Sequence, residues 1–311
     1  MEALEPASDA TLDALRGRIE RQLLGKRDVV ELALVCVLAG GHLLLEDVPG
    51  VGKTTLGLAI ARALGGRFRR VQFTSDLLPA DILGATVLDP RTGAFSFRPG
   101  PVFANVMLAD EINRTTPRTQ SALLEAMNEG QVSVDGETVA LPDPFLVIAT
   151  QNPQEFHGTF PLPDAQLDRF LVRTSMGYPA REAERAILRG DARRYSDEGA
   201  AVTAPELAAL RASVAAVRVH EDIEDYVLDL VEASRSTTAL ARGVSTRGAE
   251  ALVRASRALA RLRGRDYVIP EDIRLLAIPV LAHRVVARAE MGTPAAETAI
   301  RAMLAALPSP L

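Results

Sequence analysis

Apolar residues in the first half of the chain fall into runs of strand length and stretches with helical spacing. Residues 11–24 place apolar side chains on one helical face, and a second helix is expected over 28–38, ended by Gly40. A third helix is expected over 54–64. Strand-like runs recur at residues 42–46, 68–74, 105–109, 144–150 and 170–174. Strands alternating with helices predict an α/β fold with a parallel sheet and flanking helices.

Two shorter patterns interrupt this alternation and predict β-hairpins inserted on the core. Residues 86–88 and 94–97 flank a turn that contains Gly93. Residues 131–140 contain Asp135-Gly136, a favoured two-residue hairpin turn, between two alternating segments.

Past residue 178 the strand signals cease and helical spacing takes over. Helices are expected over 181–194, 205–217, 223–234, 246–262 and 270–289. We therefore expect an α/β domain over residues 1–178 and an all-α domain over residues 179–311.

A glycine-bearing loop joins the strand at 42–46 to the helix that follows it. It matches the end of the phosphate-binding pattern G-x-x-x-x-G-K-[ST], but Asp47 replaces the first glycine. Backbone N–H groups around the loop glycines are expected to meet phosphate oxygens, with Lys53 on the β- and γ-phosphates and Thr54 on Mg²⁺. The expected nucleotide contacts are Pro49, Gly50, Val51, Gly52, Lys53, Thr54 and Thr55.

Lysine is rare in this chain, which makes its positions informative. Of 35 basic residues only Lys26 and Lys53 are lysines. The lysine at position 53 therefore indicates a site that requires a compact ammonium, which a planar guanidinium does not replace.

A second acidic motif follows the apolar run that ends at residue 109. Asp110 is expected to bind Mg²⁺ through water, and Glu111 to act as the general base on the attacking water. A solvated Asp-Glu pair at the start of a helix is the alternative reading of this motif. Its position downstream of the phosphate loop favours the catalytic reading.

Four motifs in order resemble the MoxR family of AAA+ ATPases, and the resemblance runs from about residue 24 to 286. They are Leu44–Thr54, Leu108–Arg114, Ala149–Pro153 and Gln166–Phe170. The family shares the Asp47 departure. The resemblance implies a P-loop AAA+ nucleotide domain followed by a helical lid, with ATP and Mg²⁺ as its ligands.

The resemblance also implies three further site residues. Asn152 matches sensor 1, which holds the attacking water, although a plain turn asparagine is the alternative. Arg169 matches the arginine finger that acts on a neighbouring subunit, and the alternative is a surface ion pair with Asp168. Arg247 matches sensor 2 at the start of a lid helix, and the alternative is a solvated helix charge.

The function implied by the resemblance is ATP hydrolysis in a ring, most simply a hexamer, that remodels or matures a client protein. A von Willebrand factor A protein is an expected partner. The two hairpins resemble the helix-2 insert and the pre-sensor-1 hairpin, which in the family face the ring pore or a partner. The rival readings are the ATPase subunit of a metal chelatase and a slow nucleotide-dependent binding switch.

Composition limits the other classes of function. A net charge of -5 and few aromatic residues, 4%, disfavour nucleic-acid binding. The four histidines lack metal-site spacing, and Cys36 alone builds no disulfide framework. The chain starts without a signal-peptide core, and its most apolar run, 31–46, is too short to span a membrane, so we expect a cytoplasmic protein.

Overall fold

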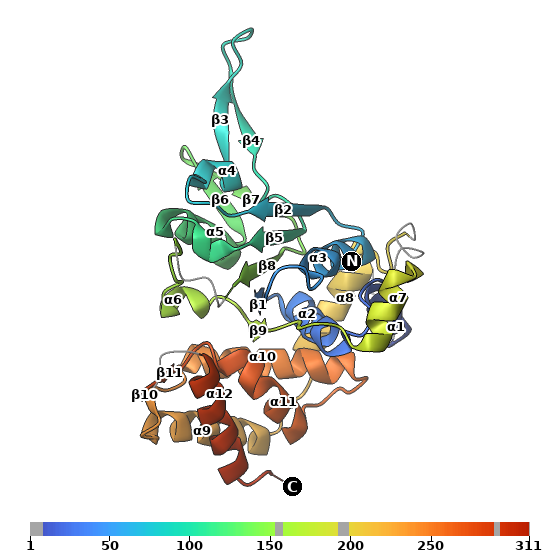
Figure 1. The fold of residues 1–311 in the computed structure, drawn as a ribbon, viewed down its shortest axis with the longest axis vertical. Coiled ribbons are helices and arrows are strands. Elements are labelled where there is room, and N and C mark those ends of the chain that lie inside the picture. The colour runs from blue at the N-terminus through green and yellow to red at the C-terminus, as the bar shows by residue number, and fades with distance from the viewer. Residues whose placement is uncertain (1–8, 153–157, 192–198, 289–292, 311) are drawn as a thin grey trace.

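A five-stranded parallel sheet forms the centre of the computed structural model, which describes residues 9–152, 158–191, 199–288 and 293–310 (Figure 1). The strand order is β2-β5-β8-β1-β9, and every pairing is parallel. The strands are β2 (Phe68–Gln72), β5 (Val106–Asp110), β8 (Leu146–Gln151), β1 (Leu43–Glu46) and β9 (Val172–Thr174). The parallel sheet predicted from the apolar runs is confirmed.

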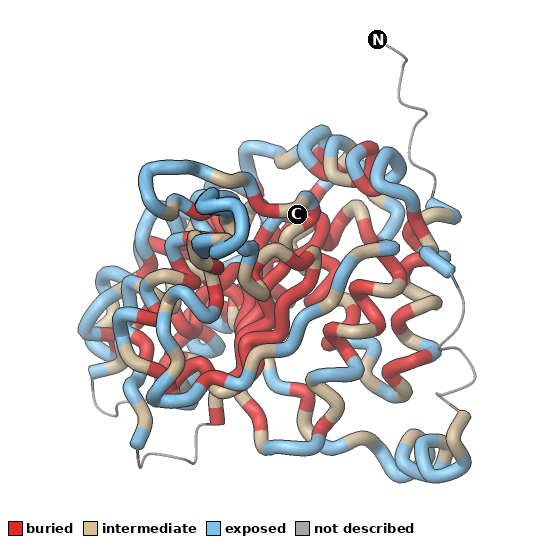
Figure 2. The backbone as a smooth tube through the Cα atoms, turned by 90° about the horizontal axis from the view of Figure 1, so that it is seen from above, coloured by how far each residue is buried: buried red, intermediate tan, exposed pale blue. Residues whose placement is uncertain are grey.

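Alternate residues of the central strands feed two separate hydrophobic cores. Leu43, Leu108 and Ile148 join one core, whereas Leu44 and Met107 join the other. The first core is completed by helices including α1 (Asp9–Gln22), α2 (Arg27–Ala39) and α3 (Lys53–Ala63). The second involves α4 (Pro79–Leu83), η1 (Ile112–Arg114) and α5 (Pro117–Glu129). Because both faces are covered, the strands read as continuous apolar runs, and Figure 2 shows the resulting buried centre.

Both hairpins form as antiparallel pairs outside the main sheet, as expected. The first consists of β3 (Gly84–Leu88) and β4 (Phe95–Pro99), and the second of β6 (Gln131–Val134) and β7 (Glu137–Ala140). Asp135 and Gly136 both have positive φ, 52° and 85°, as the favoured hairpin turn requires. The β3–β4 hairpin projects from the molecule at the end opposite the C-terminal helices (Figure 1).

The C-terminal part is helical, with three departures from the expectation. Its helices are α7 (Arg181–Leu188), α8 (Ala204–Ala215), α9 (Glu221–Ser236), α10 (Thr246–Leu262), α11 (Pro270–Leu281) and α12 (Thr293–Ala306). The helix expected over 181–194 ends at Leu188, and its residues 192–194 lie outside the described residues. The helix expected over 270–289 was wrong beyond Leu281, and the prediction that strands cease was wrong too. Residues Val286–Ala287 form β11, which pairs with β10 (Leu240–Arg242).

The early end of α11 has a tertiary cause. Arg284 is 6% exposed, and its guanidinium donates to the backbone oxygens of Phe170 at 2.8 Å and Asp168 at 3.1 Å. His283 also faces the Phe170 carbonyl oxygen, at 2.9 Å. These contacts turn the chain out of the helical path toward the nucleotide domain, and no local spacing signals them.

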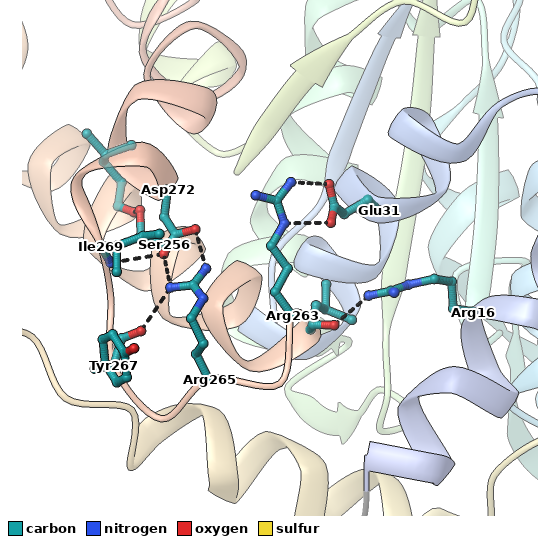
Figure 3. Close-up of polar contacts among 10 residues, drawn as sticks. Arg16, Glu31, Ser256, Arg263, Arg265, Tyr267, Ile269 and Asp272 are labelled. Atoms are coloured by element: carbon teal, nitrogen blue, oxygen red, sulfur yellow. Dashed lines mark hydrogen bonds and ion pairs between the residues drawn. The ribbon is translucent and has the colours of Figure 1, made fainter.

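The C-terminal helices are docked onto α1 and α2 rather than separate from them. The first hydrophobic core runs from α1 through α3 and continues into α8–α12. Arg263 forms a two-pronged ion pair with Glu31 of α2, at 3.1 and 3.0 Å, and Arg16 of α1 donates to the Leu262 carbonyl (Figure 3). The C-terminal end of α10 and the connection that follows it are thus attached to helices α1 and α2.

Candidate nucleotide site

The carboxyl ends of β1, β5 and β8 meet beside the loop that precedes α3. Gly50 and Gly52 have φ of 87° and 102°, a backbone region that glycine adopts without strain. The loop therefore curls around the N-terminus of α3, whose free N–H groups favour anions. A cavity of about 330 Å³ lies here, between the loop, both predicted carboxylates and Asn152.

The expected nucleotide contacts divide between this cavity and a second one. Pro49, Gly50, Gly52, Lys53 and Thr54 line the first, which we call the phosphate cavity. Val51 and Thr55 line the second instead, a space of about 440 Å³ on the other side of the loop. Apolar side chains including Leu23, Leu58 and Ile187 form much of its wall, so we call it the apolar cavity. The two cavities share the loop glycines and Thr54.

The Asp110 carboxylate is nearly buried and has partners on both oxygens. Its Oδ1 accepts from the Thr150 hydroxyl at 2.7 Å. Its Oδ2 accepts from the Arg70 guanidinium, Nη2 at 2.5 Å and Nε at 3.1 Å. Sequence reasoning missed Arg70, although charged and amide residues within the short strand run 68–74 were a signal for a strand that ends at a site.

Glu111 follows directly and is held in an unusual backbone conformation. Its φ of 58° is left-handed, which costs free energy for a non-glycine residue and is concentrated at functional sites. Its N–H donates to the Thr150 hydroxyl at 2.8 Å. Its carboxylate accepts from Gln72 Nε2 at 2.6 Å and pairs with Arg114 at 3.2 Å. Gln72, like Arg70, was not predicted.

Asn152 lies at the end of β8, between the strands that lead to the phosphate loop and to Asp110. It is 9% exposed and lines the phosphate cavity. The Lys53 ammonium reaches back to the Asp47 carbonyl oxygen at 3.0 Å. The residues predicted for the site thus bring one ammonium, one hydroxyl, two carboxylates and an amide to the cavity, which Arg70 and Gln72 also line. Such a donor set fits a magnesium triphosphate.

The two predicted arginines lie elsewhere. Arg169 and Arg247 line a third cavity of about 310 Å³, which we call the arginine cavity, together with Arg254 and Arg284. Asp168 pairs with Arg284 at 2.7 Å and Arg247 at 3.8 Å. Arg169 forms no ion pair with any residue that the structure describes, so the surface pair considered for it with Asp168 is not formed.

Comparison with known proteins places the chain in a family. A family model described as the ATPase family associated with various cellular activities (AAA) matches residues 42–172, and an AAA lid domain model matches 232–303. A crystal structure of a Cytophaga hutchinsonii protein, described there as an ATPase, matches with a TM-score of 0.84 at 35% identity over 94% of each chain. Bacillus subtilis YeaC, uncharacterized, is 46% identical over 94% of this chain and 93% of its own length.

The decisive relative is Chaperone MoxR1 of Mycobacterium tuberculosis, 43% identical over 89% of this chain and 76% of its own length. This chain belongs to the MoxR family of AAA+ ATPases. The P-loop AAA+ fold with a helical lid is therefore confirmed, and membership of the family implies nucleotide binding. In this MoxR-family chain the AAA match covers the whole phosphate cavity, and the lid match covers Arg247 and Arg284 of the arginine cavity. None of the described helices is long and apolar enough to cross a membrane.

Proposed function

We propose that this chain hydrolyses ATP at sites shared between neighbouring subunits of a ring, a hexamer, and uses the change of shape to remodel a partner protein. One observation carries the proposal. A single chain presents two incomplete half-sites, since Glu111 and Asn152 line the phosphate cavity and Arg169 and Arg247 line the arginine cavity. A neighbour's arginine cavity completes the site when it faces the phosphate cavity.

In the first half-site each residue acts on the triphosphate or on water. Lys53 binds the β- and γ-phosphates, and Thr54 and Asp110 hold the metal. A magnesium ion held by these two residues would offset the negative charge of the phosphates. Glu111 orients the attacking water and accepts its proton, and Asn152 donates to that water. Before the nucleotide arrives, arginines neutralise both carboxylates, Arg70 on Asp110 and Arg114 on Glu111.

In the second half-site Asp168 positions the arginines. Its carboxylate pairs with the buried Arg284 and with the exposed Arg247, and Arg169 is the next residue along the chain. The Arg169 guanidinium, without an acidic partner among the described residues, is available for a phosphate from outside the chain. Arginine fingers of this kind contribute roughly 10³–10⁵-fold in rate.

The partner-binding part of the proposal rests on the relatives and the hairpins. A relative at 43% identity is named a chaperone. On the projecting β3–β4 hairpin Phe95 is 72% exposed and Leu88 48% exposed, and such apolar side chains mark protein-binding surfaces. We propose that the hairpins contact a client or a von Willebrand factor A protein. We also propose a functional division at residue 178, although the two parts share one core.

Replacement of Glu111 by Gln tests the proposed chemistry. The amide keeps the size of the side chain but accepts no proton, so we expect turnover to fall about 10²–10⁴-fold. ATP binding should persist and oligomers should become easier to trap. Phosphate release and equilibrium nucleotide binding are the measurements. The matched control is Glu125→Gln, on the exposed side of α5, which should turn over like the wild type. Unchanged turnover in Glu111→Gln would refute the assigned base.

A further inference from the structure

The backbone of residues 176–178, between β9 and α7, is held from two sides. The Asp47 carboxylate accepts from the Met176 N–H and, at 3.2 and 3.3 Å, from the Gly177 N–H. On the other side, the Lys26 ammonium donates to the carbonyl oxygens of Met176 at 2.5 Å and Tyr178 at 2.8 Å. Two N–H groups and two carbonyls of this three-residue segment are thus bound by one anion and one cation.

These contacts require the two residue types that the chain places here. Asp47 is 8% exposed and stands where the general phosphate loop has glycine, which has no side chain to accept these N–H groups. Lys26 is one of only two lysines among 35 basic residues. A compact ammonium bonds two carbonyls from one point, whereas a guanidinium is a flat fork. The departure from the loop pattern therefore has a structural partner.

Asp47 and Lys26 together form what we call the clamp on segment 176–178. The clamp is connected to the phosphate cavity through the backbone of Asp47. The Asp47 carbonyl accepts from the Lys53 ammonium at 3.0 Å, and its N–H donates to Gln151, the residue before Asn152, at 3.1 Å. If the Lys53 ammonium binds phosphate, it gives up its bond to the Asp47 carbonyl. The side chain of that same Asp47 holds segment 176–178. The residue whose side chain holds the segment therefore also borders the phosphate cavity.

On its other end, the segment leads to a wall of the apolar cavity. Pro179 and Ile187 line that cavity opposite the phosphate loop, and Lys26 lines it too. Helix α7 also approaches the chain before α2, because a Cβ added at Gly25 would lie 2.8 Å from the Ala183 Cβ. The clamp thus fixes where α7 begins relative to the loop.

We propose that Asp47 and Lys26 are positioning residues for nucleotide binding. Together they hold segment 176–178 so that α7 closes the apolar cavity over the nucleoside while Lys53 binds the triphosphate. This inference rests on the proposed function, in which one ATP occupies the phosphate cavity and the adjoining apolar cavity.

The test compares ATP with inorganic triphosphate, which lacks the nucleoside. Dissociation constants are measured for both ligands, with magnesium, on the full chain and on Asp47→Gly and Lys26→Gln. Each variant should weaken ATP binding about tenfold, the scale of a lost charge-assisted bond, and leave triphosphate binding within about twofold. The double variant should bind ATP about as tightly as either single variant, because both residues hold one segment.

Controls separate this outcome from general damage. Arg27→Gln removes the neighbouring charge, whose side chain is 84% exposed, and should bind both ligands like the wild type. Asp47→Asn, which retains one acceptor oxygen, should fall between Asp47→Gly and the wild type. Equal losses for ATP and triphosphate, or a wild-type ATP constant in Asp47→Gly, overturn the clamp. Absence of magnesium-ATP binding in the wild type instead overturns the proposed function.

Discussion

Two arginines in the connection between α10 and α11 provide a matched stability experiment. Arg265 and Arg263 each form a two-pronged ion pair, with Asp272 and Glu31 respectively (Figure 3). Both pairs are two-pronged, with oxygen-to-nitrogen distances of 2.6 and 2.7 Å for the first and a longer 3.1 and 3.0 Å for the second. The pairs differ in burial: the Asp272 side chain is 0% exposed, and that of Glu31 is 27% exposed.

Burial sets the expected cost of removing each guanidinium. Among the described residues, Arg265→Met leaves the buried Asp272 carboxylate with only the Ile269 N–H, at 3.1 Å, as a donor. Breaking a buried pair from one side costs about 3–5 kcal/mol. Arg263→Met leaves Glu31 in contact with water, and such a pair contributes about 0–1 kcal/mol. We therefore expect Arg265→Met to lower the free energy of unfolding by at least about 2 kcal/mol more than Arg263→Met does.

The assay is urea unfolding followed by far-UV circular dichroism, because the chain has no tryptophan. The midpoint should shift strongly in Arg265→Met and little in Arg263→Met, with unchanged slopes. The double change Arg265→Met with Asp272→Asn should recover part of the loss, since it removes the stranded charge. Equal destabilisation by the two single changes would refute the argument that burial of the carboxylate sets the magnitude.

Two further predictions concern the shared site and pH. The variants Arg169→Ala and Glu111→Gln should each be inactive alone, and mixing them should restore ATPase activity. In the mixture an intact base can face an intact arginine across an interface, so no recovery would contradict the shared site. Burial lowers the pKa of His42 from 6.5 to about 4, where Val147 N–H donates to Nδ1 and Nε2 faces the Met127 carbonyl. The contribution of neutral His42 to the free energy of unfolding is complete above pH 6.5, and about 3 kcal/mol of it is lost as the pH falls toward 4. Urea midpoints of His42→Gln should therefore depend less on pH than those of the wild type, and parallel pH profiles would contradict this.

The local parts of the fold and site followed from the sequence. The phosphate loop, the Asp110-Glu111 pair and the hairpin turn at Asp135 each depend on residues a few positions apart, so spacing alone located them. The structure gathers the loop, both carboxylates and Asn152 around one cavity, as expected. Their catalytic roles remain proposals.

The parts that escaped depend on which strands and helices become neighbours. Arg70 and Gln72 reach the carboxylates only because β2 pairs with β5, a register that no local pattern contains. The end of α11 is set by contacts of Arg284 across more than 100 residues of chain. The partners of Asp47 are equally distant, which is why its departure from the loop pattern had no explanation at the sequence level.

The docking of the lid limits how ATP hydrolysis can produce motion. Helix α10 packs along α2 within the same core as the sheet's helices. Arg263, just after α10, and Arg284, just after α11, attach the lid to the nucleotide domain at two further places. A lid that swung away from its own nucleotide domain would expose that core and strand buried charges, at a cost near the whole stability of a domain. We therefore expect the lid to move with α1 and α2 as one body. In the ring proposed above, movement would then be concentrated between subunits, where the phosphate cavity of one is proposed to meet the arginine cavity of the next.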